Sequence, residues 1–354
     1  LYDAKNNSIF LDKSTGVTTG RDMWVTGFSK DKVINMSRLL VDKYNSEVDR
    51  LINEPVELKK TLADKDEKQI KWDDNLYKTL DKNQYIELDD SCLIEYMYRP
   101  FTKKYIMYDK QIIQRVRKFG NVWGEKNFLI YTSGPGSKVF STISVNTIPD
   151  KGLLSAGQGF YVLDNSKNSI FDNGYQFNIN EKIAAQFELS EKELIYYIYG
   201  ILHSNSYLNK YSSDLTKTIP RIPNLVNKKE IVSIGKDLFD LHTNYEDAPK
   251  YKNVVLNIKE NANYKVKKMK FEDKEKKDTI IFNEFITITN IPSKAYAYTL
   301  SGKSAIEWIM DQYQIKKDSK SQIVDDPNEY SEDETYILNL LLKKKKLEDI
   351  TSSL

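Results

Sequence analysis

Cysteine, histidine and long apolar runs are scarce in this sequence of 354 residues. Cys92 is the only cysteine, so no disulfide can form within the chain, and a reducing cytoplasm suits it. His203 and His242 are the only histidines, which makes a zinc site of the usual Cys/His type nearly impossible. No run of about 18 apolar residues occurs, which excludes a membrane span. We therefore expect a cytoplasmic protein without a structural metal.

Motifs for nucleotide binding and methyl transfer are also missing. Gly302-Lys303-Ser304 matches the end of a phosphate-binding P-loop, but Ala297 stands where the first glycine is required, so we interpret it as a helix start. The glycine-rich stretch 133–138 lacks Gly-x-Gly-x-x-Gly spacing, so it is no dinucleotide or S-adenosylmethionine loop. No Pro-Pro pair occurs, which removes the Asp/Asn-Pro-Pro-aromatic tetrapeptide that holds a flipped base.

The sequence contains residues for two hydrolytic sites, a metal-dependent nuclease and a Ser–His–acid triad, but their sequence context does not favour either. Asp150 with Glu275-Lys276-Lys277 resembles a nuclease signature, but these residues fall in a loop and a charged turn, and charged tracts generate such triplets freely. Spacing alone leaves a Ser–His–acid triad open, because its members are not sequence neighbours. His203 follows the apolar face of an expected helix, so we interpret it as a capping or packing residue. We predict that the chain carries no catalytic centre.

The composition is that of a globular protein with no strong charge bias. Hydrophobic residues make up 40% and charged residues 29%, and the net charge is +2. A dedicated non-specific nucleic-acid binder would be far more basic, although a local basic face remains open. The 24 tyrosines fit either half-buried sheet faces or aromatic–basic DNA-contacting surfaces. The first residue is not Met and no leader pattern follows, so we interpret the start as an internal position of a longer polypeptide.

The periodicity predicts an α+β fold, with mixed or antiparallel sheets of short strands, connecting loops, flanking helices and a helical C-terminal section. Ser29 is expected to cap a helix to Leu51, Ser190 opens a capping box, and a second box is expected at Ser331. Residues 72–162 and 252–300 are assigned to short strands, with 265–278 as a solvated hairpin tip. We predict four parts, namely a strand-turn and long helix (1–70), a β-rich DNA-reading subdomain (71–180), a helical core or spacer (181–250) and a β-hairpin with C-terminal helices (251–354).

One segment, Gly16-Val-Thr-Thr-Gly-Arg-Asp22, surrounds an arginine with small and hydroxyl residues. It is either a tight turn with Arg21 paired to an acid, or a loop whose arginine donates to a phosphate or base edge.

A second segment, residues 96–109, places Arg99, Lys103 and Lys104 beside Pro100. It forms either half-buried strands or a hairpin tip suited to a DNA groove, and Arg115, Arg117 and Lys118 add a basic cluster downstream.

A third group of loops comprises residues 131–138, Ile148-Pro-Asp150 and Gly157-Gln-Gly159. Glycine and serine let a backbone approach DNA closely, and Gln158 has the groups that read adenine through N6 and N7. The residues that we predict to face DNA are Thr19, Arg21, Arg99, Lys103, Lys104, Arg115, Arg117, Ser133, Ser137, Lys138 and Gln158.

Taken in order, the segments resemble the C-terminal part of Type ISP restriction–modification enzymes from about Ser14 to Leu341. The matching segments are Gly-Val-Thr-Thr-Gly-Arg-Asp22, Tyr98-Arg-Pro-Phe101, Ser-Gly-x-Gly-Ser137, Ile-Pro-Asp150, Tyr199-Gly-x-Leu-His-Ser204, Leu-x-x-x-Ile-Pro-Arg-Ile-Pro223, Leu-His-x-Asn-Tyr-Glu246, Ser-Ala-Ile-Glu-Trp308 and Asp-Asp-Pro-Asn328.

That resemblance implies a target-recognition domain that follows a nuclease, an ATP-driven translocase and an N6-adenine methyltransferase in one polypeptide. S-adenosylmethionine, ATP and Mg²⁺ would belong to the parent and none to this chain. The implied partners are double-stranded DNA with a short asymmetric target and the upstream methyltransferase, with no membrane and a monomeric state. The alternatives are an interdomain docking module with little DNA contact, and a fragment with nuclease or methyltransferase activity of its own.

Overall fold

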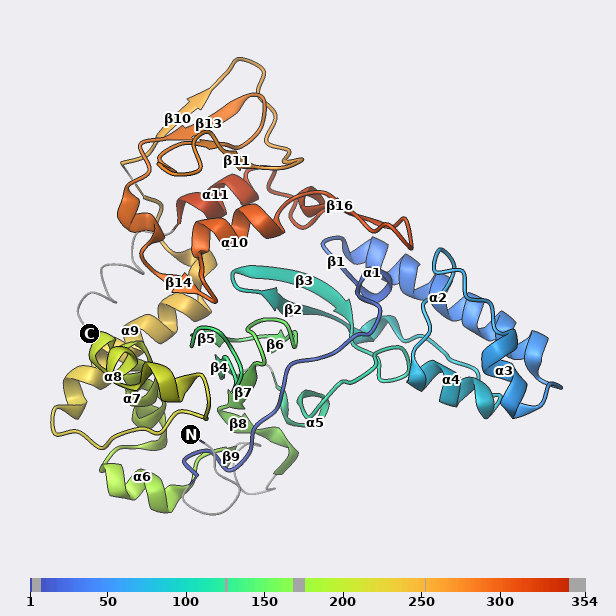
Figure 1. Cartoon of the computed structure of the whole chain (residues 1–354), viewed down its shortest axis with the longest axis horizontal. Helices are drawn as coiled ribbons and strands as arrows, with labels where there is room; N and C mark the ends of the chain where they lie inside the picture. The colour runs from blue at the N-terminus through green and yellow to red at the C-terminus, as the bar shows by residue number, and fades with distance from the viewer. Residues whose placement is uncertain (2–7, 125–126, 168–175, 252, 344–354) are drawn as a thin grey trace.

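The computed structural model describes residue 1 and residues 8–124, 127–167, 176–251 and 253–343 (Figure 1). In those parts the α-helices are α1 (Asp22–Val25), α2 (Lys30–Leu51), α3 (Val56–Leu62), α4 (Asp74–Asp81), α5 (Phe119–Val122), α6 (Glu181–Phe187), α7 (Glu191–His203), α8 (Asn205–Leu215), α9 (Lys228–Thr243), α10 (Ala305–Gln312) and α11 (Tyr336–Leu342). None of these helices is both long and apolar enough to cross a membrane.

The strands are short and form several small sheets. In chain order they are β1 (Thr26–Gly27), β2 (Leu93–Arg99), β3 (Thr102–Met107), β4 (Leu129–Thr132), β5 (Thr142–Val145), β6 (Ile148–Pro149), β7 (Gln158–Tyr161), β8 (Leu163–Asp164), β9 (Gln176–Phe177), β10 (Val255–Ile258), β11 (Lys270–Phe271), β12 (Ile280–Ile281), β13 (Ile286–Thr289), β14 (Thr299–Leu300), β15 (Lys303–Ser304), β16 (Lys316–Lys317) and β17 (Val324–Asp325).

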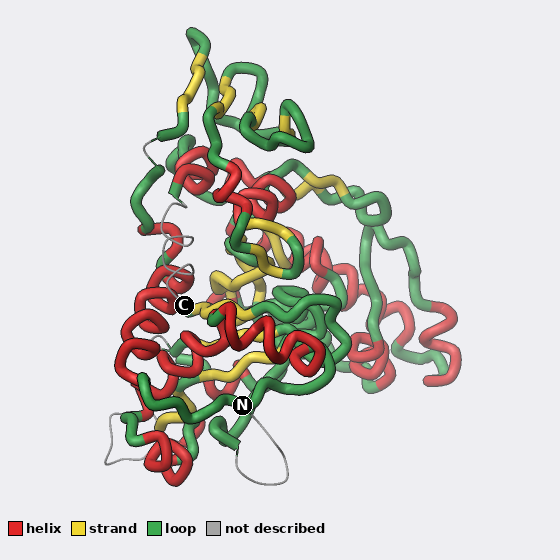
Figure 2. The backbone as a smooth tube through the Cα atoms, turned by 60° about the vertical axis from the view of Figure 1, so that its left-hand side comes forward, coloured by secondary structure: helices red, strands yellow, loops and turns green. Residues whose placement is uncertain are grey.

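Sheet order confirms the predicted α+β class with mixed and antiparallel sheets. The sheets run β1-β3-β2-β6, β5-β4-β7 and β10-β13-β12-β11, and β8-β9, β14-β15 and β16-β17 form two-stranded pairs. The β2–β6 pair is parallel, and the other pairs are antiparallel. Figure 2 shows helices on both sides of the central strands, with the β10–β13 sheet extending to one end.

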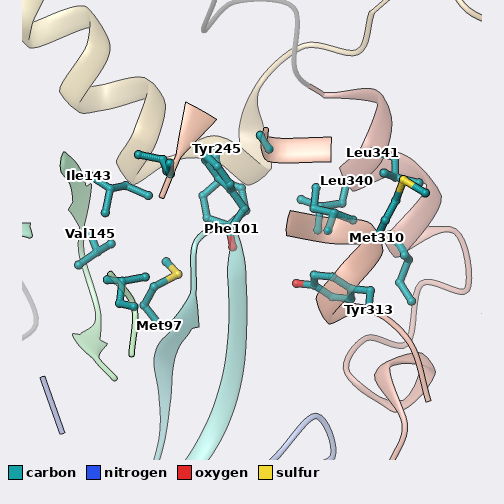
Figure 3. Close-up of a cluster of buried hydrophobic side chains, with 14 of the residues drawn as sticks. Met97, Phe101, Ile143, Val145, Tyr245, Met310, Tyr313, Leu340 and Leu341 are labelled. Atoms are coloured by element: carbon teal, nitrogen blue, oxygen red, sulfur yellow. The ribbon is translucent and has the colours of Figure 1, made fainter. Parts of the chain in front are cut away.

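Three groups of buried side chains hold these elements together. The largest joins the β2–β3 hairpin and the β4–β5 sheet to α10 and α11, and Figure 3 shows Phe101 and Tyr245 between Met97 and Met310. A second group packs α6–α9 against β4 and β7, and a third packs α2 and α4 against the outer face of β3. Because the first group runs from Val17 to Leu342, the four-part division by sequence remains a proposal.

The long helix forms where the sequence predicts it. Ser29 accepts a hydrogen bond from the Lys32 amide and begins α2, and Val33, Leu40 and Val48 lie on its buried face. Each fully buried aliphatic side chain of this kind contributes about 1.5–3 kcal/mol. The predicted capping box of Ser190 and Glu193 at α7 is confirmed.

Close contact between α7 and α9 depends on two glycines. A Cβ at Gly235 would overlap the carbonyl oxygen of Tyr196, and one at Gly200 would lie 2.7 Å from the carbonyl oxygen of Ile231. The segment Tyr199-Gly-x-Leu-His lies in the core, because Tyr199 is buried and its hydroxyl accepts from the Ser144 amide at 2.8 Å.

Three local predictions were wrong. Helix α4 lies in the stretch assigned to strands, because Asp73 caps it at the Leu76 amide and Leu76 and Leu80 are buried together. The box expected at Ser331 does not form, since α11 begins after Thr335 without a side-chain cap, whereas Ser304 and Glu307 form a box at α10. The stretch 265–278 is more than a solvated tip, because β11 lies within it.

Candidate nucleic-acid interface

A cleft of about 680 Å³ lies where segments that are far apart in the sequence meet. Its walls come from the loop at 17–22, from Tyr98 and Arg99 at the end of β2, and from the loop at 150–156, with Asp318 from the β16–β17 turn. Parts of all three segments singled out by sequence therefore meet in one place. Pockets of this size take a small ligand, a base edge or a sugar–phosphate segment rather than a whole duplex.

The two glycine-containing loops pair backbone to backbone. The Val17 amide donates to the Pro149 carbonyl at 2.8 Å, and the Lys151 amide donates to the Val17 carbonyl at 2.8 Å. A Cβ at Gly16 would overlap the carbonyl group of Asp150, so only glycine permits this contact. The cleft wall is consequently held by main-chain hydrogen bonds.

Arg99 and Asp150 form an ion pair of 2.6 Å at the edge of the cleft. The guanidinium also lies over the ring of Tyr98, 3.9 Å from its centre. Burial raises the pKa of Asp150 to about 6, and the nearby Arg99 opposes that rise. The side chain of Arg99 is 23% exposed, so the site offers a cation, a buried carboxylate and an aromatic ring side by side. Donors, acceptors and a ring face are the groups that read base edges.

Thr19 and Arg21 are buried in the wall of the cleft rather than exposed in it. Arg21 is 1% exposed, pairs with Asp73 at 2.6 Å and donates to the carbonyl oxygens of Lys71 and Ile112. The Thr19 hydroxyl donates to Asp22. Of the two alternatives for this segment, the geometry is that of the tight turn with an acid-paired arginine, so we remove both residues from the proposed contact set.

The β2–β3 hairpin does not present a free basic tip, which corrects that expectation. Its turn residue Phe101 is fully buried against Tyr245. Lys104 is 6% exposed and pairs with Asp325 at 2.5 Å, and Lys103 pairs with Glu246 at 2.6 Å. Acidic residues from distant segments neutralise both lysines, and we remove them from the set as well.

Arg115 and Arg117 keep the accessibility that DNA contact requires. The Arg115 amide donates to the Thr18 carbonyl at 2.9 Å, which places this basic segment beside the cleft. Arg115 is exposed and Arg117 half-buried. Burial lowers the pKa of Arg117, and the charge of Arg115 lowers it further. Neither arginine pairs with a carboxylate among the residues that the structure describes, so both remain free for an anion.

The third group of loops contributes unevenly. Ser133 and Ser137 are buried in the turn after β4, and the Ser133 hydroxyl accepts from the Ser141 amide at 2.9 Å. Lys138 is exposed, but it borders a separate cleft with His203 and Tyr298. Gln158 is half-buried at the start of β7 and accepts from Lys13. This group therefore does not meet the first cleft through the residues that we predicted.

His203 lies in a buried aromatic cluster. Its Nδ1 lies 2.8 Å from the Tyr199 carbonyl oxygen, and burial lowers its pKa to about 4. Its ring stacks on His242, whose Nδ1 lies 2.6 Å from the Tyr199 hydroxyl. This geometry agrees with a packing role. No group of three or more potential metal ligands occurs in the described parts of the chain.

Lys151 and Asp22 line the cleft but were missed by the sequence analysis. Lys151 is exposed, directly follows the Ile-Pro-Asp150 segment, and makes no ion pair with a described carboxylate. Its adjacency to Asp150 was the available signal, whereas nothing in the sequence placed its amide against the Val17 carbonyl.

The fold and this surface define a class, namely an α+β module whose loops and unpaired cations gather around one cleft, as in proteins that recognise nucleic acid. The chain belongs to the family of Type ISP C-terminal specificity domains, whose model matches residues 8–340. The resemblance found in the sequence is thereby confirmed. No curated protein sequence matches the chain.

Several solved structures share the fold, and three of them have the following likeness to this chain. A nuclease-deletion mutant of the Type ISP enzyme LlaGI with a DNA substrate mimic is 38% identical, with a TM-score of 0.90 over 99% of this chain and 28% of that one. The ATP-dependent Type ISP enzyme LlaBIII bound to DNA is 38% identical, with a TM-score of 0.90 over 99% of this chain and 23% of that one. A DrdV–DNA complex is 20% identical, with a TM-score of 0.86 over 99% and 37%, which is likeness of fold alone. This chain spans less than a third of either Type ISP enzyme.

Proposed function

We propose that this chain recognises a short asymmetric sequence in double-stranded DNA on behalf of a Type ISP restriction–modification enzyme. The observation that carries the proposal is the single cleft formed by residues 17–22, 98–99 and 150–156 with free arginines beside it. The 38% identical relatives were solved with DNA or a DNA mimic, which supports the same ligand here.

In the proposed contact, duplex DNA lies across the mouth of the cleft. Arg99, held by Asp150, donates to a base edge, and Arg115, Arg117 and Lys151 contact phosphates. Lys138 and Gln158 stay in the proposed set at its margin. Because phosphate contacts fix position and base contacts specify sequence, the two groups have separable effects on binding.

The parent polypeptide supplies the chemistry in this proposal. Recognition would place the target adenine for an upstream N6-adenine methyltransferase, and would couple to ATP-driven translocation and cleavage. S-adenosylmethionine, ATP and Mg²⁺ would bind in those domains, and the enzyme would act as a monomer in the cytoplasm.

A binding experiment with three single variants tests the assignment. The target is first selected from random duplexes, and affinities for target and scrambled duplexes are then measured by fluorescence anisotropy. Arg99→Lys keeps the positive charge but loses the planar guanidinium that can donate two parallel hydrogen bonds to one base. We therefore expect the affinity for the target to fall about 5- to 150-fold, which corresponds to roughly 1–3 kcal/mol. The affinity for scrambled DNA should change little. Arg115→Gln should weaken both duplexes equally and reduce the salt slope by about 0.9.

Arg221→Gln is the matched control, because Arg221 is an exposed arginine on the connector between α8 and α9. It should change neither affinity nor slope. A wild-type chain that binds target and scrambled duplexes equally contradicts the proposed function, and an unchanged preference in Arg99→Lys contradicts the role of that residue.

A docking role has one observation of its own. At the end of α2 and along α3, Ile52, Val56, Leu58 and Leu62 are 42–51% exposed. Exposed apolar patches are typical of protein contacts, so the end of α2 together with α3 is suited to contact with another domain of the parent. Such contact is compatible with DNA recognition elsewhere, and a chain without any sequence-dependent DNA binding would favour docking as the main function.

A further inference from the structure

A row of lysines lies outside the cleft described above. Between Asn263 and Phe271 the sequence has Lys265, Lys267, Lys268 and Lys270 and no carboxylate. All four side chains are exposed, and so is Lys317 on β16. None of these five, which we call the lysine ridge, pairs with a carboxylate in the parts of the chain that the structure describes. A protein with a net charge of only +2 therefore concentrates unneutralised charge here.

The backbone beneath the ridge is fixed. The Asn328 side chain accepts from the Val266 amide at 2.7 Å and donates to the Val266 carbonyl at 2.9 Å. The Asn283 side chain donates to the carbonyls of Asn263 and Lys265 at 2.8 and 3.1 Å. Val266 and Met269 are buried between the lysines. Since two asparagines and two buried anchors hold the chain from behind, the cations point outward from an ordered support.

The β16–β17 hairpin connects the ridge to the cleft. The Ile315 amide donates to the Lys267 carbonyl at 3.0 Å, which joins the ridge to β16. The turn after β16 contributes Asp318 and Ser321 to the cleft. In Figure 1 this β16–β17 hairpin runs from the β11 end of the upper sheet towards α2. A ligand lying across the cleft can therefore extend over the hairpin onto the ridge.

One more lysine, Lys316, lies on the hairpin between the cleft and the ridge. Lys316 is half-buried on β16, and its ammonium group contacts Gln312 at 3.5 Å. Burial lowers the pKa of Lys316, and the positive charges of Lys104 and Arg99 lower it further. The carboxylates of Asp311 and Asp325 oppose this shift. Lys316 therefore lies between the cleft and the ridge, close to cations and carboxylates alike.

We propose that the lysine ridge binds the phosphate backbone of duplex DNA on one side of the recognised sequence, without reading bases. This inference rests on the proposed function and adds a second, sequence-independent contact to it. Lysine is suited to that task because its ammonium group is a point charge that meets a phosphate without the fixed geometry that base reading requires. The ridge would hold the flank in register while the cleft reads the target.

The test replaces Lys265, Lys267, Lys268 and Lys270 together by glutamine in the 354-residue chain. The probes are the selected target and a scrambled duplex, each made at minimal length and with a flank of roughly 10 base pairs, one helical turn, on either side. We expect roughly tenfold weaker binding of both long duplexes and a salt slope reduced by up to about 3.6, at about 0.9 per phosphate contact. Minimal duplexes should bind as they do to the wild type.

Two matched variants separate charge from position. Glutamine at Lys182, Lys192, Lys210 and Lys229, which are exposed on α6–α9, removes the same charge and should leave binding unchanged. Arginine at the four ridge positions keeps the charge and should keep the affinity and the slope. Thermal unfolding curves that match the wild type verify that each variant is folded.

The possible outcomes distinguish this inference from the proposed function. A wild type that prefers its target, together with a ridge variant of unchanged affinity and slope, overturns the ridge and leaves the proposed function standing. An equal loss in the control variant also overturns the ridge, because net charge alone would explain the effect. A wild type without sequence preference, but with binding that depends on the ridge, overturns the proposed function and supports the ridge. A wild type that binds no duplex overturns both.

Discussion

The β2–β3 hairpin and the lysine ridge have similar sequences but opposite surroundings. Each combines tyrosine or phenylalanine with several cations, and each carries two lysines in succession. Lys104 in the hairpin is 6% exposed and paired with Asp325, whereas Lys267 and Lys268 in the ridge are exposed and unpaired among the described residues. The comparison teaches that a run of lysines in the sequence does not show whether the side chains are exposed, because the fold can bring buried acids to them.

The largest difference between the two regions should appear in stability. Lys104→Ala leaves Asp325 as a buried charge without its partner, so we expect the free energy of unfolding to fall by about 3–5 kcal/mol. Lys268→Ala removes an exposed lysine and should change stability by less than about 0.5 kcal/mol. Urea denaturation of both variants measures the difference. Equal losses would show that the hairpin pair is not a structural contact.

The pH dependence of stability should sharpen the distinction at the cleft. The folded chain raises the pKa of Asp150 from 3.8 to about 6, so between these values the folded state binds more protons than the unfolded state. The contribution of this group is present below about pH 4 and is lost as the pH rises through about 6. Relative to Asp150→Asn, the free energy of unfolding of the wild type should therefore fall by up to about 3 kcal/mol between pH 4 and 7.

Denaturant titrations of both proteins across that range test the sign. A difference that stays constant with pH would mean that Asp150 titrates normally. The ridge offers the control, since Lys268→Ala should follow the wild-type pH profile throughout.

A smaller effect is expected from the support of the ridge. Asn328→Ala deprives the Val266 amide and carbonyl of their partner, and we expect a loss of about 1–3 kcal/mol. Hydrogen exchange at the Val266 amide should accelerate in the same variant. Unaltered exchange would indicate that water replaces the Asn328 side chain, and that this side chain does not fix the backbone of the ridge.

The sequence resemblance located the family, but it could not say which cations are free. Arg21, Lys103 and Lys104 were predicted to face DNA because they stand among glycines and tyrosines. Their partners lie far away along the chain, since Arg21 donates to the Ile112 carbonyl 91 residues later and Lys104 pairs with Asp325 221 residues later. Local sequence carries no trace of such contacts.

The sequence by itself determined the α+β class and some local elements, among them helices α2 and α7. Helices α2 and α7 follow from Ser29, from the Ser190–Glu193 box and from helical periodicity, because caps and apolar faces are properties of neighbouring residues. Only the tertiary structure decided which loops line the cleft, which arginines and lysines are neutralised, and that the stretch 265–270 is an ordered row of free lysines. Those properties depend on acids, amides and carbonyls that folding brings together from distant parts of the chain.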